Sequence, residues 1–248
     1  MEARAFKGIF PGSFTMGNLV CGFIAIVSAA SGDIITACWL IILGGFFDAL
    51  DGKVARISGA TSPFGVQLDS LSDVVTFGTA PAVIMYLVIP ASLGKWSWII
   101  CVVYLIAASY RLARYNLHAD GEEKKGFWGL PVPGAGLTLS SYVIFCNEIW
   151  GEIRYMEYLI AMVLLFALLM VSQVEYDAIP DHFNNKRNRI KVAMVTVAAV
   201  TGLIWPKLLL FPFFALYIII GLVREGYRYF YVSWDYVKGG NRKEGNSK

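Results

Sequence analysis

Four aspartates at two regular spacings are the residues of this chain best suited to chemistry. Asp48 and Asp51 are three residues apart, and Asp69 and Asp73 are four apart, so each pair lies on one face of a helix. The segment that carries them lies between apolar runs long enough to span a bilayer. An Asp near the bilayer centre costs about 2.5 to 3.5 kcal/mol on insertion scales. The four carboxylates therefore need a cationic partner, and a divalent metal is the natural candidate.

The link between the two pairs predicts how they meet. Residues 52–64 include Gly59 and Pro63, which favour a turn that lets the flanking helices pack back against each other. The carboxylates would then converge, and hard oxygen ligands suit Mg²⁺ or Mn²⁺ better than Zn²⁺. Two such ions about 3.5 to 4 Å apart form a clamp used in phosphoryl-group displacement. The predicted ligands of two divalent cations are Asp48, Asp51, Asp69 and Asp73.

Small and cationic residues near the aspartates suggest a phosphate-containing ligand. Gly52, Ala55 and Gly65 leave room for its close approach. Arg56 offers a planar fork for phosphate oxygens. We therefore expect a diphosphate to bind beside the aspartates.

Written as a pattern, residues 48–73 read D-x2-D-G-x2-A-R-x8-G-x3-D-x3-D. This pattern resembles the signature of the CDP-alcohol phosphatidyltransferase family at every fixed position. The resemblance implies a membrane enzyme in which the two metal ions lie over the diphosphate of a CDP-lipid and CMP leaves. It implies that Asp73 also acts as the general base for the attacking hydroxyl. The residues expected to contact the CDP diphosphate are Gly52, Ala55, Arg56, Ser62 and Gly65, together with Thr15 and Asn18.

Other segments resemble one branch of the family. Residues 11–23 read PGSFTMGNLVCGF and look like the P-N-x2-T-x2-N-L-x-C-G-F opening of bacterial and archaeal phosphatidylserine synthases, with Gly12 in place of Asn. The segments SYRLARYNL and KGFWGLPVPGAG are similar to parts of the same synthases. This likeness implies L-serine as the acceptor, with CDP-diacylglycerol or CDP-archaeol as the donor. Thr15 and Asn18 share one helix face, where they could bind the diphosphate, orient the acceptor, or join two helices.

Two arginines are candidates for binding the acceptor. Arg111 and Arg114 are one helical turn apart, and a guanidinium can bind the carboxylate of serine through two hydrogen bonds. Arg111 is the first candidate and Arg114 the second, although both also fit as anchors at the membrane surface. A glycerol phosphate or inositol phosphate acceptor is the alternative within this chemistry, and it should require a denser basic cluster. Intramembrane carboxylates also occur in cation transporters, which would leave the Gly, Ala and Arg of the motif unexplained.

Composition predicts an all-α polytopic membrane protein. Hydrophobic residues make up 57% of the 248 and charged residues 16%, and several apolar runs reach the length of about 17 to 25 residues that a spanning helix needs. We predict one integral-membrane domain over residues 1–234 and a polar, disordered tail over residues 235–248. The eight expected transmembrane helices are residues 14–30, 34–56, 64–89, 96–116, 130–149, 155–174, 190–205 and 208–227.

Basic residues predict the orientation of these helices. Eighteen Lys and Arg fall on the side that holds both termini and the aspartates, against three on the other side. Both termini and the active site are therefore expected at the cytoplasmic face of the cell membrane. A signal peptide ending near Ala30 would fit the N-terminal pattern but would spoil this asymmetry. Residues 1–10 could form a short helix in the membrane interface.

The remaining features narrow the class of protein. No basic run with interleaved aromatics is present in a soluble segment, so a nucleic-acid partner is not expected. A homodimer is implied by the family resemblance alone. The cysteines are dispersed through apolar segments without C-x2-C spacing, which favours packing over metal binding or disulfides; they are Cys21, Cys38, Cys101 and Cys146.

Overall fold

The protein is an all-helical bundle in the part of the chain that its computed structural model describes, residues 2–58, 62–119, 129–172, 174 and 205–244. The α-helices are α1 (Glu2–Ala30), α2 (Ile34–Ser58), α3 (Pro63–Asp73), α4 (Ala80–Val88), α5 (Lys95–Ala119), α6 (Val132–Trp150), α7 (Met156–Val171) and α9 (Pro206–Glu244). A π-helical segment, η1 (Val74–Thr79), joins α3 to α4, and a 3₁₀ turn, η2 (Ala91–Leu93), precedes α5. The all-α prediction is confirmed. The helix predicted over residues 190–205 lies outside the described residues except for Trp205.

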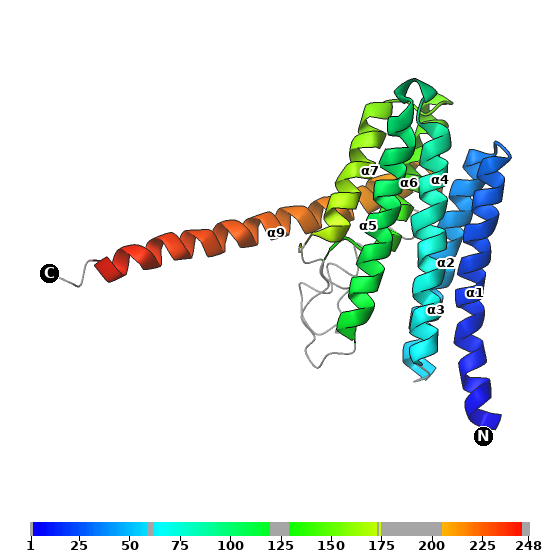
Figure 1. Cartoon of the computed structure of the whole chain (residues 1–248), viewed down its shortest axis with the longest axis horizontal. Coiled ribbons are helices and arrows are strands. Elements are labelled where there is room, and N and C mark those ends of the chain that lie inside the picture. The colour runs from blue at the N-terminus through cyan, green and yellow to red at the C-terminus, as the bar shows by residue number, and fades with distance from the viewer. Residues whose placement is uncertain (1, 59–61, 120–128, 173, 175–204, 245–248) are drawn as a thin grey trace.

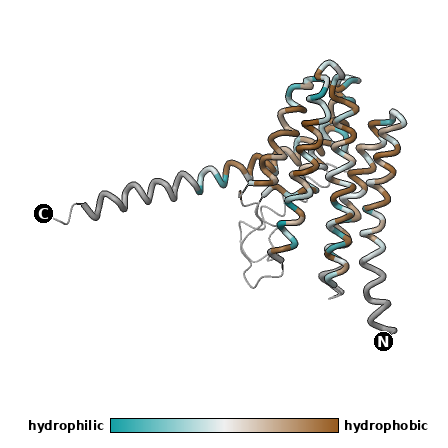
Figure 2. Tube along the Cα trace, in the orientation of Figure 1, coloured by the Kyte–Doolittle hydropathy of each residue, from teal (hydrophilic) through white to brown (hydrophobic). Residues whose placement is uncertain are grey.

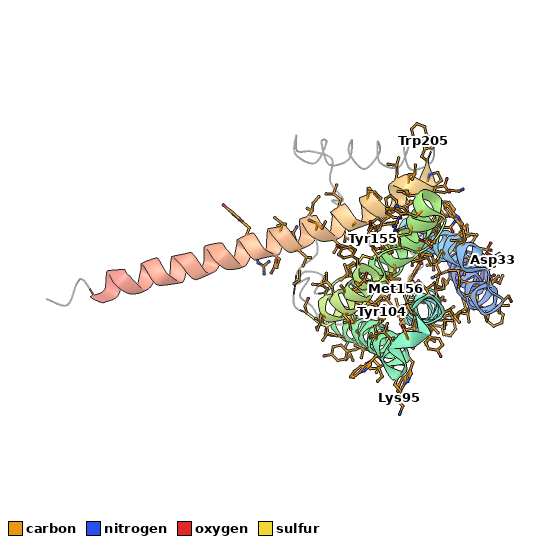
Figure 3. The ribbon with its side chains drawn as sticks, turned by 90° about the horizontal axis from the view of Figure 1, so that it is seen from above. Asp33, Lys95, Tyr104, Tyr155, Met156 and Trp205 are labelled. Carbon is orange, nitrogen blue, oxygen red and sulfur yellow. The ribbon has the colours of Figure 1, made fainter. Side chains whose placement is uncertain are left out.

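Helices α1 to α7 run side by side, whereas α9 crosses the bundle and extends away from it (Figure 1). Figure 2 shows apolar residues along most of the bundle, with polar bands in the lower halves of α3 and α5. Viewed from above, α9 leaves the bundle from the side where Tyr155 and Trp205 lie, away from Asp33 and Lys95 (Figure 3). Polar residues are therefore concentrated in these parts of α3 and α5, within a bundle of mostly apolar helices.

Five helical segments of the described chain are long and apolar enough to cross a membrane, and α7 is a shorter apolar helix. The five are Gly12–Ala30, Ile34–Val54, Pro63–Val88, Lys95–Leu117 and Pro206–Arg228. Helix α6, predicted as a span, is not among them. Much of α6 is buried, and its Ser140 and Thr138 hydroxyls donate to carbonyl oxygens one turn earlier. It can therefore carry polar side chains that a lipid-facing helix would not.

Two helices extend beyond their predicted ends. Helix α1 is continuous from Glu2, so residues 2–10 belong to it rather than to a separate interfacial helix. Helix α9 continues to Glu244, through residues expected to be a disordered tail. Starting a new helix is costly, whereas adding a residue to an existing one is close to neutral. A polar segment attached to a packed helix can therefore remain helical where the same segment alone would not.

The predicted helix 64–89 is interrupted at its centre by η1, directly after Asp73. The Tyr104 hydroxyl of α5 donates to the Phe77 carbonyl oxygen at 2.8 Å. Glycines of other helices allow this wider turn to approach them closely: a Cβ on Gly22 would lie 2.4 Å from the Thr76 Oγ1, and one on Gly136 would lie 3.0 Å from the Phe77 Cα. Contacts from three helices therefore fix the position of η1, and Asp73 directly precedes this segment.

All four cysteines are buried, as the predicted packing role requires. They lie in α1, α2, α5 and α6.

Candidate active site

Three carboxylates converge, one from α2 and two from α3. Asp48, Asp69 and Asp73 each bring one oxygen to within 4.8 Å of the others. Asp73 is buried, and Asp48 and Asp69 are half-buried. They line a cavity of about 270 Å³, whose other lining residues are Ser70, Arg111, Leu112, Tyr115, Pro131 and Pro133. Asp48 of α2 thus meets Asp69 and Asp73 of α3, as the sequence predicts.

Helix α3 has a capped N-terminus. The Ser62 side chain accepts a hydrogen bond from the Gly65 N–H at 3.0 Å, and Pro63 occupies the first turn. A Ser cap followed by Pro is a strong helix start, because the cap satisfies an N–H that the helix cannot and Pro lacks one. Ser62 therefore fixes the start of α3, the helix that carries Asp69 and Asp73.

The fourth aspartate lies beside this cluster and has a partner of its own. Asp51 is buried, and its carboxylate accepts a hydrogen bond from the Thr15 hydroxyl of α1. Its charge also acts on Asp48 and Asp69. The structure therefore brings three of the four predicted ligands together and places Asp51 alongside them.

Helix α1 contacts the acid cluster through a second side chain. The Asn18 amide nitrogen donates to the Asp73 Oδ1 at 3.1 Å, and the Thr76 hydroxyl of η1 donates to the Asn18 carbonyl oxygen at 2.9 Å. Gly44 leaves space for this amide, because a Cβ there would lie 2.9 Å from the Asn18 Oδ1. Of the possibilities left open for Thr15 and Asn18, the structure shows interhelical hydrogen bonds that orient carboxylates.

Arg111 is the described cation that lines the cavity. Its side chain is only 6% exposed, and its Nε has no hydrogen-bond partner. The guanidinium carbon lies 5.3 Å from the centre of the Tyr115 ring, and its charge acts on Asp73. A buried donor without a protein partner is unusual and points to a ligand.

Arg114, one turn further along α5, is used differently. Its guanidinium donates to the carbonyl oxygens of Val171 at 3.0 Å and Ser172 at 3.1 Å, at the C-terminal end of α7. Cationic donors are favourable there, because the last carbonyls of a helix lack partners. The structure thus separates Arg114 from the cavity lining and makes it a clasp between α5 and α7.

The clasp also holds the loop that precedes α6. Gly129 has φ +83°, and a Cβ there would lie 2.4 Å from the Met170 carbonyl oxygen. The Gly129 N–H donates to the Val174 carbonyl oxygen at 2.8 Å, and the Leu130 N–H donates to that of Leu169 at 3.1 Å. This anchoring places Pro131, the next residue, in the cavity wall.

Other predicted site residues are less closely tied to the cavity. Gly52 lies on the exposed face of α2. The backbone of Ala55 and Arg56 is helical, but their side chains lie outside the described residues. The predicted contacts of these residues with a diphosphate stay predictions.

One polar pair at the cavity edge was not predicted from the sequence. The Asn116 amide nitrogen of α5 donates to the Ser70 hydroxyl at 2.9 Å, and Ser70 lines the cavity. Ser70 directly follows Asp69, and Asn116 lies in the SYRLARYNL segment. The predicted ligand Asp69 and the SYRLARYNL segment therefore pointed to this part of the chain. Only the packing of α3 against α5 makes Ser70 and Asn116 partners.

The donor set fits a divalent cation. Three carboxylate oxygens converge, and no described Lys or Arg side chain forms a salt bridge with them. Carboxylate oxygens are the ligands that Mg²⁺ and Mn²⁺ prefer. The convergence of like charges at one point is costly without a cation and is explained by one.

Several known proteins are similar in sequence to this chain. A CDP-diacylglycerol–serine O-phosphatidyltransferase of Helicobacter pylori is 30% identical over 221 residues, which cover 87% of this chain and 90% of that protein. Another, of Methanocaldococcus jannaschii, is 35% identical over 215 residues, covering 85% of this chain and 92% of that protein. An archaetidylserine synthase of Methanothermobacter thermautotrophicus is 33% identical over 174 residues, with 68% of this chain and 70% of that protein covered.

The family model of CDP-alcohol phosphatidyltransferase matches residues 9–174. The match spans every helix that lines the cavity and includes the aspartates and Arg111. The chain therefore belongs to the CDP-alcohol phosphatidyltransferase family.

Proposed function

We propose that this protein transfers a phosphatidyl or archaetidyl group from a CDP-lipid to the hydroxyl of L-serine and releases CMP. The observation that carries the proposal is one cavity in which the buried guanidinium of Arg111 faces three converging carboxylates. The acidic side suits a diphosphate bound through cations, and the basic side suits an acceptor that carries a carboxylate. The names of the relatives support the same donor and acceptor.

Asp48, Asp69 and Asp73, with Asp51 beside them, would hold two divalent cations, either Mg²⁺ or Mn²⁺. When bound, such cations neutralise the diphosphate and stabilise the charge that develops on its oxygens. The Thr15 and Asn18 side chains orient two of these carboxylates through their hydrogen bonds. Outer partners of this kind often control affinity for a metal.

In the proposed reaction Asp73 accepts the proton of the serine hydroxyl. The hydroxyl oxygen forms a bond to the phosphorus on the lipid side of the diphosphate, and the bond from that phosphorus to the CMP oxygen breaks. The Asn18 amide keeps one Asp73 oxygen fixed. Arg111 holds the acceptor carboxylate, and Arg56, Gly52, Ala55 and Gly65 contact the CDP diphosphate.

We also propose the membrane arrangement that the basic residues predict. Eight helices cross the cell membrane, both termini are cytoplasmic, and two copies of the chain assemble. The N-terminal ends of α1 and α3 and the C-terminal ends of α2 and α5 point to the same end of the bundle (Figure 1), and α2, α3 and α5 carry the acid cluster and Arg111. The active site would then open to cytoplasmic serine while the lipid tails stay in the bilayer.

A panel of acceptors tests the proposal. The purified protein would be given a CDP-lipid, MgCl₂ or MnCl₂, and either L-serine, glycerol 3-phosphate or an inositol phosphate, with CMP release measured. We expect release with L-serine and little with either phosphorylated acceptor, because Arg111 is the only described basic side chain in the cavity lining. Release with a phosphorylated acceptor alone would keep the family chemistry and overturn serine as the acceptor.

A further inference from the structure

The π-helical segment η1 interrupts one helical column directly after Asp73. Helices α3 and α4 follow each other along this column, and η1 joins them (Figure 1). A π turn holds about one residue more than an α turn, and one residue corresponds to a rotation of about 100° in an α-helix. An α-helical path through η1 would therefore rotate α3 relative to α4. The π turn thus decides how Asp69 and Asp73 face the cavity while α4 stays packed in the bundle.

A hydrogen bond from a neighbouring helix stabilises this rare conformation. The Tyr104 hydroxyl of α5 donates to the Phe77 carbonyl oxygen of η1 at 2.8 Å. Tyr104 and Phe77 are both fully buried. A buried carbonyl oxygen that loses its donor is unfavourable. The Tyr104 hydroxyl therefore favours the wide turn over any path that moves the Phe77 carbonyl away from it.

A second contact links η1 to Asp73 itself. The Thr76 hydroxyl of η1 donates to the Asn18 carbonyl oxygen at 2.9 Å, and the Asn18 amide nitrogen donates to the Asp73 Oδ1 at 3.1 Å. Thr76 and Asn18 are fully buried. A displacement of η1 would therefore reach Asp73 in two ways, along the chain and through Asn18.

Tyr104 also lies on the face of α5 that carries Arg111. The two residues are seven apart, which is about two turns of an α-helix. Arg111 lines the cavity, and Tyr104 contacts η1. One face of α5 therefore supports both the basic side of the cavity and, through η1, its acidic side.

We propose that Tyr104 is a positioning residue for the reaction: its hydroxyl holds η1 in the π turn and thereby keeps Asp73 where it meets Asp48 and Asp69. This inference rests on the proposed function, because it assumes that these carboxylates bind metal. Tyr104 itself contacts neither the metal nor a substrate. It acts through η1 and Asp73.

The test compares Tyr104→Phe with Tyr142→Phe. The Tyr142 side chain is also buried, and its hydroxyl also donates to a backbone carbonyl, that of Arg154 at 3.0 Å, in the connection between α6 and α7. Each substitution removes one buried hydroxyl, so both variants should lose stability. Only Tyr104→Phe should raise the Kd for Mn²⁺, measured from the EPR signal of the free ion. We expect a rise of about 5-fold or more, as loss of the donor to a buried carbonyl implies.

The outcomes separate this inference from the proposed function. An unchanged Kd for Mn²⁺ in Tyr104→Phe, or an equal rise in both variants, would overturn the positioning role, while CMP release with L-serine by the wild type would still uphold the proposed function. A wild type that binds Mn²⁺ but releases no CMP with L-serine would overturn the acceptor alone. A wild type that does not bind Mn²⁺ would overturn both.

A second pair of variants tests η1 if Tyr104→Phe does not fold. Thr76→Val keeps the shape of the side chain and removes the hydroxyl that donates to Asn18. It should also raise the Kd for Mn²⁺, whereas Thr76→Ser, which keeps the hydroxyl, should stay close to the wild type. Equal values in Thr76→Val and Thr76→Ser would contradict the role of η1 in positioning Asp73.

Discussion

Two arginines one turn apart on α5 have opposite surroundings. Arg111 is buried in the cavity wall, and its Nε has no partner. Arg114 is half-buried and donates to carbonyl oxygens at the end of α7. Both are arginines on the same helix, so the partners around each side chain decide its role. A charge that the protein leaves incompletely paired is available to a ligand, whereas one bound to backbone carbonyls holds the fold.

The same contrast distinguishes the cavity around Arg111 from the contacts that Arg114 makes with α7. The cavity gathers three carboxylates and a guanidinium without forming a described salt bridge among them. The clasp between α5, α7 and the loop before α6 satisfies its donors through backbone carbonyls. Changes in the cavity should therefore affect turnover more than stability, and changes in the clasp should do the reverse.

The largest expected effect comes from the acid cluster. Asp48→Asn should lower turnover by more than about 100-fold, because it removes a charge from a shared metal site and loss of an outer partner alone costs 10- to 100-fold. CMP release from the CDP-lipid with L-serine is the measurement. Asp33→Asn is the matched control, since Asp33 is exposed and caps α2 by accepting the Thr36 N–H at 3.0 Å. Normal turnover by Asp48→Asn at saturating metal would contradict the metal assignment.

A binding measurement shows whether Asp48→Asn loses metal binding or only catalysis. Mn²⁺ at 100 times its Kd should stabilise the wild-type protein by about 2.7 kcal/mol. The resulting rise in melting temperature should be absent or much smaller in Asp48→Asn and retained in Asp33→Asn. An equal rise in both variants would mean that Asp48 does not bind the ion.

Arg111→Ala should raise the KM for L-serine about 10- to 150-fold, with the KM for the CDP-lipid changed little. The reason is the loss of a charge-assisted bidentate contact to a carboxylate, worth about 1.5 to 3 kcal/mol. Arg111→Lys should retain part of the affinity, since a point charge cannot reproduce the fork. A raised KM for the CDP-lipid with an unchanged KM for L-serine would place Arg111 on the donor side.

Asn18→Ala tests whether the hydrogen bond to Asp73 controls the affinity of the carboxylates for metal. Removing the amide that donates to Asp73 should raise the Mn²⁺ concentration needed for half-maximal activity about 10- to 100-fold. Saturating Mn²⁺ should restore most of the turnover, because the carboxylates themselves are intact. If Asn18 instead binds the diphosphate, the KM for the CDP-lipid should rise at all metal concentrations.

Arg114→Ala should have the smallest effect on turnover and a clear effect on stability. It removes charged donors from the C-terminal carbonyls of α7 and should lower the free energy of unfolding by about 1.5 to 3 kcal/mol. Thermal unfolding in detergent measures the loss, with Arg154→Ala, at the opposite end of α7, as the comparison. A tenfold rise in the KM for L-serine at an unchanged melting temperature would show that Arg114 binds the acceptor.

The sequence by itself determined the helical class, the start of most helices and the set of carboxylates. Those features follow from local rules: apolar runs of spanning length, a Ser cap with Pro at the start of α3, and the i, i+3 and i, i+4 spacing of Asp48 with Asp51 and Asp69 with Asp73. The family signature rests on the same short stretch of chain. These rules depend on neighbours in sequence, so the sequence suffices for them.

Only the tertiary structure decided which polar groups meet. It turned Asp51 toward Thr15, placed Asn18 against Asp73, and separated Arg111 from Arg114. It also opened η1 after Asp73, where glycines of neighbouring helices permit close approach. Helical periodicity tells which side chains share a face, but the partner of that face depends on how the helices turn and how closely they pack. These quantities are properties of helix pairs far apart in sequence, and no single segment contains them.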